Sequence, residues 1–186
     1  MAFLKSGGLS EKELVQRVLT KELAAQKEFF NRYAGKMMTV CRRYARHRVG
    51  AEDILQDSFI KVFNNLDQFK FEGSLEGWIR RIVVTTAIRF VGKKSFTNEL
   101  YDLENVPEEY VEPLAMSNLN EEQLLSFIQE LPAGYKLVFN MFVMEGYSHK
   151  EIADSLSIEE STSRSQLTKA RKMLQTKIIN SEKLAV

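Results

Sequence analysis

The sequence is poor in cysteine, proline and histidine, with one, three and two of these among its 186 residues. The single cysteine, Cys41, cannot form an internal disulfide, which is consistent with a reducing cytoplasm, and its apolar neighbours predict that it is buried. No apolar run approaches the roughly 18 residues that a membrane-spanning helix needs. Residues 1–8 also lack the apolar core of a secretory signal. The sequence therefore indicates a cytoplasmic protein that is not itself a membrane protein.

Residues that commonly carry chemistry are scarce as well. His47 and His149 have no partners at ligand spacing, and Cys41 lies six residues from His47 in a helical stretch, which is not a zinc pattern. The chain has neither a glycine-rich phosphate loop nor a G-x-S-x-G motif. We therefore expect no catalytic residues, no metal or other cofactor and no small-molecule substrate, so the chain is not predicted to be an enzyme.

The net charge of +1 conceals a sharp division along the chain. Residues 1–94 carry a net charge of +8, residues 95–130 carry −9 and residues 131–186 carry +2. Two basic blocks around an acidic one predict two polyanion-binding units. We expect domains at residues 1–94 and 119–186, joined by a linker at residues 95–118, which contain Pro107 and Pro113 and show no sustained period. The acidity of this linker could serve solubility, or it could repel or mimic DNA.

The first block has the periodicity of helices throughout. Between residues 9 and 48, apolar residues recur every three or four positions. Residues 51–66 form the clearest amphipathic pattern, with an apolar face made by Ile54, Leu55, Phe59, Val62, Phe63 and Leu66. A break at residues 69–74 contains Gly73, and Ser74 can cap a further helix that ends near Lys94.

The second block is predicted to contain a helix-turn-helix. One helix opens at about residue 119 and ends at Leu131-Pro132, and another runs from about residue 134 to 144. Ser148 and Glu151 form a capping box for a short helix that ends at Leu156. After a tight turn, a long helix extends from Glu160 to about Ile179. A short helix, a tight turn and a longer helix are the defining elements of this motif.

The faces of the two helices agree with that interpretation. Ile152, Ala153 and Leu156 on the short helix are apolar, and Leu167, Ala170 and Leu174 give the long helix an inward face. Its outward face suits contacts with base edges and phosphates and is made of Thr162, Arg164, Ser165, Thr168, Lys169 and Arg171. Acids at the start and bases further along are also what the helix dipole favours in any surface helix. The order Gly146-Tyr147-Ser148-x-x-Glu151-Ile152-Ala153-x-x-Leu156 favours DNA binding.

Three motifs in order resemble one family. Residues 131–174 resemble sigma region 4, which reads the −35 promoter element, and residues 51–63 resemble sigma region 2.2. Residues 69–89, with Gly73-Ser74-Leu75-Glu76-Gly77-Trp78, are similar to sigma regions 2.3 and 2.4. Together they cover nearly all of the chain after about residue 10. The chain is therefore identified as a member of the extracytoplasmic-function (ECF) sigma factors of the sigma-70 family, which implies an all-α fold of two small helical domains.

The resemblance also implies partners and site residues. RNA polymerase core would be bound through its β′ coiled coil and β flap, with Asp53, Gln56, Asp57 and Lys61 on the β′ contact. Promoter DNA would be duplex at −35 and single-stranded at −10, where the implied residues are Lys70, Phe71, Arg80, Arg81, Thr85 and Arg89. An anti-sigma factor is a further implied partner. For single residues, a solvated surface role remains open. Trp78 could belong to the core or stack on a base, and so could Phe69 and Phe71.

Four residues depart from the family pattern. Asn is common in place of Thr85, and an acid or amide in place of Arg89, so −10 affinity could rest more on phosphate contacts here. Glycine is usual in place of Ser157 and Ser161, and Ser157 at a position that tends to positive φ is expected to carry modest strain. Two other classes stay open at this point: a stand-alone helix-turn-helix regulator with a helical sensing domain, and a helical protein-binding adaptor.

Overall fold

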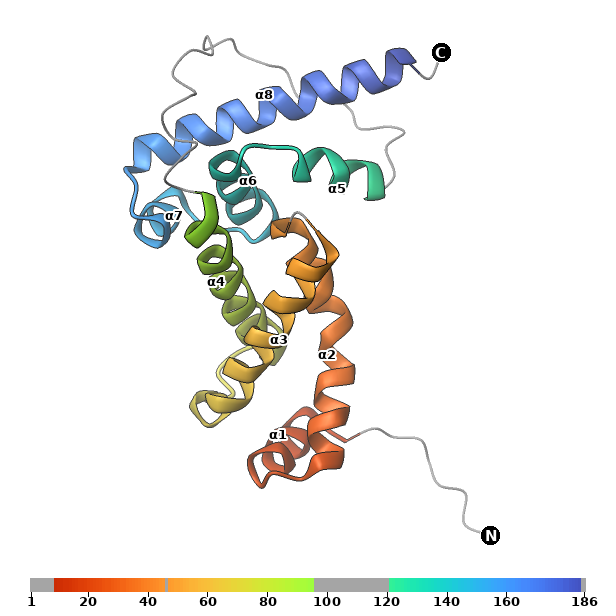
Figure 1. Cartoon of the computed structure of the whole chain (residues 1–186). Helices are drawn as coiled ribbons and strands as arrows, with labels where there is room; N and C mark the ends of the chain where they lie inside the picture. Colours follow the sequence, from red (N-terminus) through yellow and green to blue (C-terminus); the bar gives the residue numbers. More distant parts are fainter. Residues whose placement is uncertain (1–8, 46, 96–120, 185–186) are drawn as a thin grey trace. The chain divides into compact units, whose positions relative to one another are not determined.

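The computed structural model describes residues 9–45, 47–95 and 121–184, and every regular element in these ranges is helical (Figure 1). The expected all-α class is confirmed. The predicted acidic linker lies outside the described residues except at Ser95, where α4 ends. By packing, the chain divides into one unit of Met1–Cys41 with Arg48–Thr86 and another of Arg42–His47 with Ala87–Val186. The domain limits expected from the sequence stay predictions.

Unit 1 is built from amphipathic helices that share an aromatic core. Its elements are α1 (Glu11–Leu19), most of α2 (Leu23–Tyr44), α3 (Arg48–Asn64), the short 3₁₀ helix η1 (Leu66–Gln68) and the first part of α4 (Leu75–Ser95). Phe29 of α2 is fully buried, and its ring centroid lies 5.1 Å from that of Tyr33 and 5.6 Å from that of Phe63 on α3. Such ring pairs add to the hydrophobic gain of burial. Cys41 is buried, as predicted.

The apolar face predicted for residues 51–66 is the face that packs inward. Ile54, Leu55, Phe59, Val62 and Leu66 are buried and Phe63 is half-buried. The break at residues 69–74 is also present, and the N–H of Gly77 donates to Ser74 Oγ at 3.3 Å at the start of α4. A side-chain oxygen at this position satisfies an N–H that has no partner within the helix. Ser74 therefore caps α4, as the sequence indicated.

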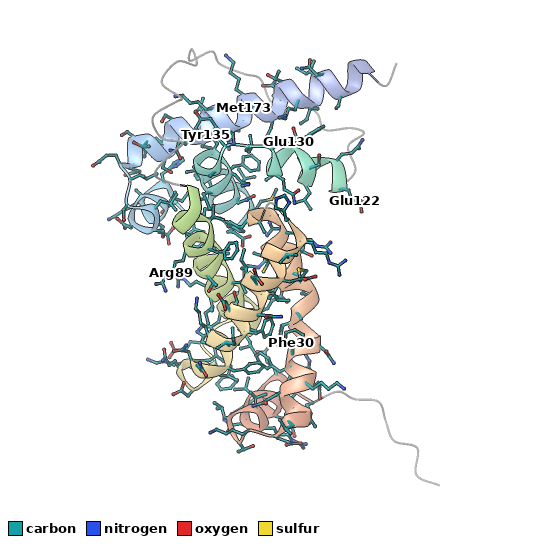
Figure 2. All side chains as sticks on the ribbon, in the orientation of Figure 1. Phe30, Arg89, Glu122, Glu130, Tyr135 and Met173 are labelled. Carbon is teal, nitrogen blue, oxygen red and sulfur yellow. The ribbon has the colours of Figure 1, made fainter. Side chains whose placement is uncertain are left out.

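Unit 2 contains the helix-turn-helix. Its elements are α5 (Glu121–Gln129), α6 (Ala133–Phe139), a π-helical turn η2 (Asn140–Met144), α7 (His149–Leu156) and α8 (Glu160–Leu184). Both α6 and α7 pack on α8, and Glu130, just after α5, forms an ion pair with Lys177 of α8 (Figures 1 and 2). The one helix expected at about residues 134–144 proves to be an α-helix that widens into a π turn, a feature often found at functional sites.

The two ends of α7 confirm two expectations. Ser148 Oγ accepts from the N–H of Glu151 at 3.2 Å, and the Glu151 carboxylate accepts from the N–H of Ser148 at 2.9 Å, which completes the capping box. Ser157 has φ 55° and ψ 47°, the left-handed conformation expected of it. Ile152, Ala153 and Leu156 of α7 are buried, as are Leu167, Ala170 and Leu174 of α8. Ile158 in the turn is half-buried.

In the part of the chain that the structure describes, no helix is both long and apolar enough to cross a membrane. Within those same residues, no three or more His, Cys, Asp or Glu side chains gather as they would around a metal ion.

Candidate functional site

The outward face of α3 brings together three of the four residues predicted to bind the polymerase. Asp53, Gln56 and Asp57 are exposed and follow the helical period, so they share one face. Lys61 is half-buried at the edge of this face, and its Nζ donates to Thr86 Oγ1 of α4 at 3.0 Å. Lys61 therefore links α3 to α4 within unit 1.

Two apolar residues on the same face of α3 were missed by the sequence analysis. Ile60 is 58% exposed and Val49 is 68% exposed. Val49, Asp53, Gln56 and Ile60 are spaced by four, three and four residues, so they form one stripe along the helix. The signal was in the sequence, because Ile60 stands seven residues after Asp53 and lies off the inward face. Exposed apolar side chains beside carboxylates suit a protein partner better than the phosphates of DNA.

An aromatic cluster lies between η1 and the start of α4. The ring of Phe69 is 4.9 Å from that of Phe71 and 5.7 Å from that of Trp78. Phe69 is 8% exposed and belongs to the core, whereas Phe71 is 41% exposed. Trp78 is half-buried against Phe69. The two alternatives for the phenylalanines thus resolve differently, with Phe69 inside and Phe71 presenting its ring to solvent.

Phe71 also has an unusual backbone. Its φ is 58°, in the left-handed region that a bulky side chain rarely adopts. Backbone strain of this kind costs about 1–3 kcal/mol and is concentrated at functional sites. Phe71 thus combines an exposed ring with a left-handed backbone. No sequence signal marked this conformation, because Gly73 was the residue expected to break the helix in this loop.

The outward face of α4 gathers positive charge. Arg81, Thr85 and Arg89 are exposed and lie four residues apart, so they follow one side of the helix. Figure 2 shows Arg89 on α4. Arg80 is half-buried and occupies another side of the helix, and exposed Lys70 precedes Phe71 in the loop. The Thr85 hydroxyl donates to the carbonyl oxygen of Arg81 at 2.8 Å, so its lone pairs remain to accept a hydrogen bond.

The outward face of α8 has a similar composition. Arg164, Thr168 and Arg171 are exposed at spacings of four and three residues and share one face. Arg164 forms an ion pair with Glu160 one turn earlier. Thr162, Ser165 and Lys169, also predicted for this site, are half-buried on neighbouring sides of the helix. Of the six residues predicted to bind the −35 element, only Arg164, Thr168 and Arg171 are exposed.

His149, the first residue of α7, contacts both of its neighbouring elements. Its ring stacks on Phe142 of η2, with centroids 4.4 Å apart and an interplanar angle of 23°. Its Nδ1 lies 2.9 Å from Ser163 Oγ of α8, at hydrogen-bond distance. Burial of the ring, with the positive charge of Arg164 as the second cause, lowers the pKa of His149 below its usual value of 6.5. These contacts could not be predicted from the sequence, because they depend on how three elements pack.

Two sequence families match the parts of the chain that carry these faces. The family model of Sigma-70 region 2 matches residues 29–97, and the family model of Sigma-70, region 4 matches residues 121–174. The chain belongs to the sigma-70 family. The ECF RNA polymerase sigma-E factor of Haemophilus influenzae is 28% identical, over 91% of this chain and 96% of the relative. Those of Salmonella typhimurium LT2 and Escherichia coli K12 are 25% and 24% identical, over 91% of this chain and 95% of each relative.

The sigma factor is of the ECF type, and it binds RNA polymerase and directs transcription initiation. Sigma factors are initiation factors and not enzymes. A stand-alone regulator is not favoured, because the region 2 match accounts for the helices that a sensing domain would need to form.

Two solved structures show a looser likeness. CnrH in complex with the cytosolic domain of CnrY is 17% identical, with a TM-score of 0.48 over 90% of this chain and 96% of that one. The sigma factor RpoE in complex with the anti-sigma factor NepR from Bartonella quintana is 17% identical, with a TM-score of 0.49 over 83% and 96%. At this level of similarity they add nothing to the assignment.

Proposed function

We propose that three separate surfaces of this sigma factor divide the work of initiation. The stripe on α3 binds the polymerase, the loop before α4 and the outward face of α4 hold the opened −10 element, and the outward face of α8 reads the −35 element. The contrast in chemistry between these faces carries the proposal. The α3 face presents carboxylates and exposed apolar side chains, whereas the α4 and α8 faces present arginines. Only the latter attract the phosphates of DNA.

On α3, the partner is the coiled coil of the polymerase β′ subunit. Ile60 and Val49 supply apolar surface that is removed from water on binding, and Asp53 and Gln56, which lie between them along the stripe, supply polar contacts together with Asp57. Such a mixture of apolar and polar surface is ordinary in protein interfaces, which as a whole are only about as apolar as the rest of a protein surface. Lys61 contributes from the edge of the face, where its bond to Thr86 fixes its position. The resemblance to the family adds the β flap as a second contact, made by residues 119–186.

At the −10 element, the proposed task is to hold unpaired bases. Single strands bind to proteins by stacking on aromatic rings and by attraction of their phosphates to a basic groove. Phe71 provides an exposed ring on a strained loop, and Lys70, Arg81 and Arg89 provide the charge. Thr85 can accept from the amino group of a base. Arg80 lies on another side of α4, and we assign it to phosphates further along the strand from the base that stacks on Phe71.

At the −35 element, α8 enters the major groove as the recognition helix. Arginine binds guanine through two parallel hydrogen bonds, so Arg164 and Arg171 are the proposed base readers. Thr168 lies between them on the same face, and its hydroxyl donates to the carbonyl oxygen of Arg164 at 3.1 Å. Thr162, Ser165 and Lys169 lie beside this face and are assigned to the walls of the groove and its phosphates.

The family resemblance supports two further proposals. We place the protein in the cytoplasm, where the polymerase and the chromosome are, and we propose an anti-sigma factor as its inhibitor. Purification of the tagged protein from its native host tests the second proposal. Recovery of a stoichiometric protein that blocks polymerase binding is the expected result, and transcription activity that is unrestrained in every extract would contradict it.

The experiment for the main proposal is transcription in vitro with purified core polymerase, genomic DNA and this protein, followed by mapping of new RNA 5′ ends. We expect discrete starts that share two sequence elements at −35 and −10. Active core polymerase and folded protein that together give no new starts would overturn the proposal.

A further inference from the structure

Two aromatic side chains outside the proposed DNA contacts touch the recognition helix at two points. His149 of α7 reaches Ser163 Oγ of α8 at 2.9 Å. Phe142 of η2 stacks on His149, and the Cζ atom of Arg171 of α8 lies over the Phe142 ring, 5.9 Å from its centroid. All four residues belong to unit 2. Phe142 and His149 will be called the aromatic brace.

The two contact points frame the part of α8 that reads DNA. Ser163 and Arg171 are eight residues apart, which is about 12 Å of helix at about 1.5 Å per residue. Four of the six predicted −35 residues lie between them: Arg164, Ser165, Thr168 and Lys169. We propose that the aromatic brace is a positioning device for −35 recognition, which sets the rotation of α8 through Ser163 and the guanidinium of Arg171 through Phe142. This inference rests on the proposed function of α8.

The contact with Ser163 has a physical consequence for α8. Ser163 is fully buried and lies on the inward side of the helix, next in sequence to exposed Arg164. A hydrogen bond is strongly directional, so the His149–Ser163 pair resists rotation of α8 about its own axis. Neighbouring residues on a helix point in directions about 100° apart, so the direction of buried Ser163 also sets the direction of Arg164. A rotation of α8 would therefore turn Arg164 and Thr168 away from the base edges.

The contact with Arg171 works on the side chain itself. Arginine has a long, flexible side chain and loses rotamer freedom when it binds a base. A guanidinium held over an aromatic ring has already lost part of this freedom, and the ring stabilises the cation. Since Phe142 is itself stacked on His149, its ring is held in place. Arg171 is therefore partly ordered before DNA arrives.

The π turn explains how Phe142 comes to this place. An α-helix that continued from α6 without the wider turn would rotate Phe142 to a different side, because a π turn inserts an extra residue. The core of unit 2 is made by other side chains, among them Leu137, Met141 and Ile152, while Phe142 and His149 are half-buried at the edge. Loss of the brace should therefore affect recognition more than folding.

The test uses the whole protein bound to core polymerase and a promoter found by start mapping. The measured quantity is the ratio of affinities for this promoter and for the same promoter with a scrambled −35 element. Phe142→Leu keeps an apolar side chain of somewhat smaller volume and removes the ring, and we expect it to lower this ratio about 2- to 5-fold, as for a cation–π contact at an exposed site. Phe142→Tyr keeps the ring and should retain the wild-type ratio. Val143→Ala, at the exposed neighbour in the same turn, is the matched control and should leave the ratio unchanged.

A double-mutant cycle shows whether Phe142 acts through Arg171. In an Arg171→Ala background, Phe142→Leu should have little further effect on the ratio. An equal effect in both backgrounds, or a wild-type ratio for Phe142→Leu, overturns the brace. If Phe142→Leu lowers the melting temperature, the comparison moves to His149→Phe, which keeps the stack, and His149→Leu, which loses it; equal ratios for these two also overturn the brace. A wild-type holoenzyme that does not distinguish the two promoters refutes the −35 role of α8 and the brace together.

Discussion

The ring of Phe71 packs against that of Phe69 at 4.9 Å, yet the two phenylalanines differ in exposure, 41% against 8%. Phe69 anchors the loop to the core of unit 1, and Phe71 extends from it on a backbone with φ 58°. A buried ring therefore supports an exposed one. In the proposed function, this pair is the aromatic surface on which an unpaired base stacks.

Phe71→Leu should impair promoter opening while the fold is retained. Stacking of a base on an aromatic ring contributes about 1–3 kcal/mol, so the stability of the open complex should fall at least about 5-fold. Permanganate reactivity of unpaired thymines in the −10 region measures this. Phe69→Ala should impair opening too, because it removes the ring that supports Phe71, and unlike Phe71→Leu it should also lower the melting temperature, because removal of a buried phenylalanine costs about 3–5 kcal/mol. Undiminished opening by Phe71→Leu would show that the exposed ring is not used.

Ile60→Glu should weaken binding to core polymerase without weakening DNA contacts. Burial of an isoleucine contributes about 1.5–3 kcal/mol, so affinity should fall about 10- to 100-fold. Competition with labelled wild-type protein for core polymerase measures the change. Leu23→Glu, at an apolar residue of α2 that is 80% exposed and off the α3 stripe, is the control and should bind as the wild type does. Equal losses from both variants would place the interface elsewhere.

Ser157→Gly should stabilise the helix-turn-helix. The left-handed conformation costs a residue with a Cβ about 1–2 kcal/mol. It costs glycine less, but glycine loses more chain entropy on folding. The expected net gain is about 0.5–1 kcal/mol, which corresponds to a rise of a few degrees in melting temperature. Ser157→Ala keeps the Cβ and is the matched control. A glycine variant no more stable than the alanine variant would contradict the argument.

His149 should titrate below its ordinary pKa near 6.5, because its burial and the positive charges of Arg164 and Arg171 outweigh the attraction of Glu160. The folded state then binds a proton less readily than the unfolded chain. The contribution of His149 to the free energy of unfolding should consequently be fully present above pH 6.5 and be lost as the pH drops below that value. Imidazole proton shifts give the midpoint in the intact protein, and a midpoint at or above 6.5 would reverse the sign.

Local sequence signals predicted much of the fold. The capping box of Ser148 and Glu151 and the cap at Ser74 involve only a few neighbouring residues, so both could be identified from spacing. The left-handed turn at Ser157 is local too, and the family resemblance pointed to it, because glycine is usual at that position. The inward face of α3 followed from its period. These features are local, and local rules therefore suffice for them.

Most of the features that were missed have no local signal in the sequence. The stack of Phe142 on His149 joins two elements, and neither the backbone of Phe71 nor the π turn at Asn140–Met144 has a short sequence motif that marks it. Lys61 was assigned to a docking face, but its bond to Thr86 could not be foreseen without the placement of α4. Exposed Ile60 could have been found from the period of α3, had exposure of an apolar side chain been considered.

The most direct test of the account is a footprint on a promoter found by start mapping, with and without core polymerase. We predict protection at both −35 and −10, with unpaired bases at −10, only when the protein and core polymerase are present together. Equal protection by the protein alone, with no opening on addition of core polymerase, would contradict the division of work among α3, α4 and α8.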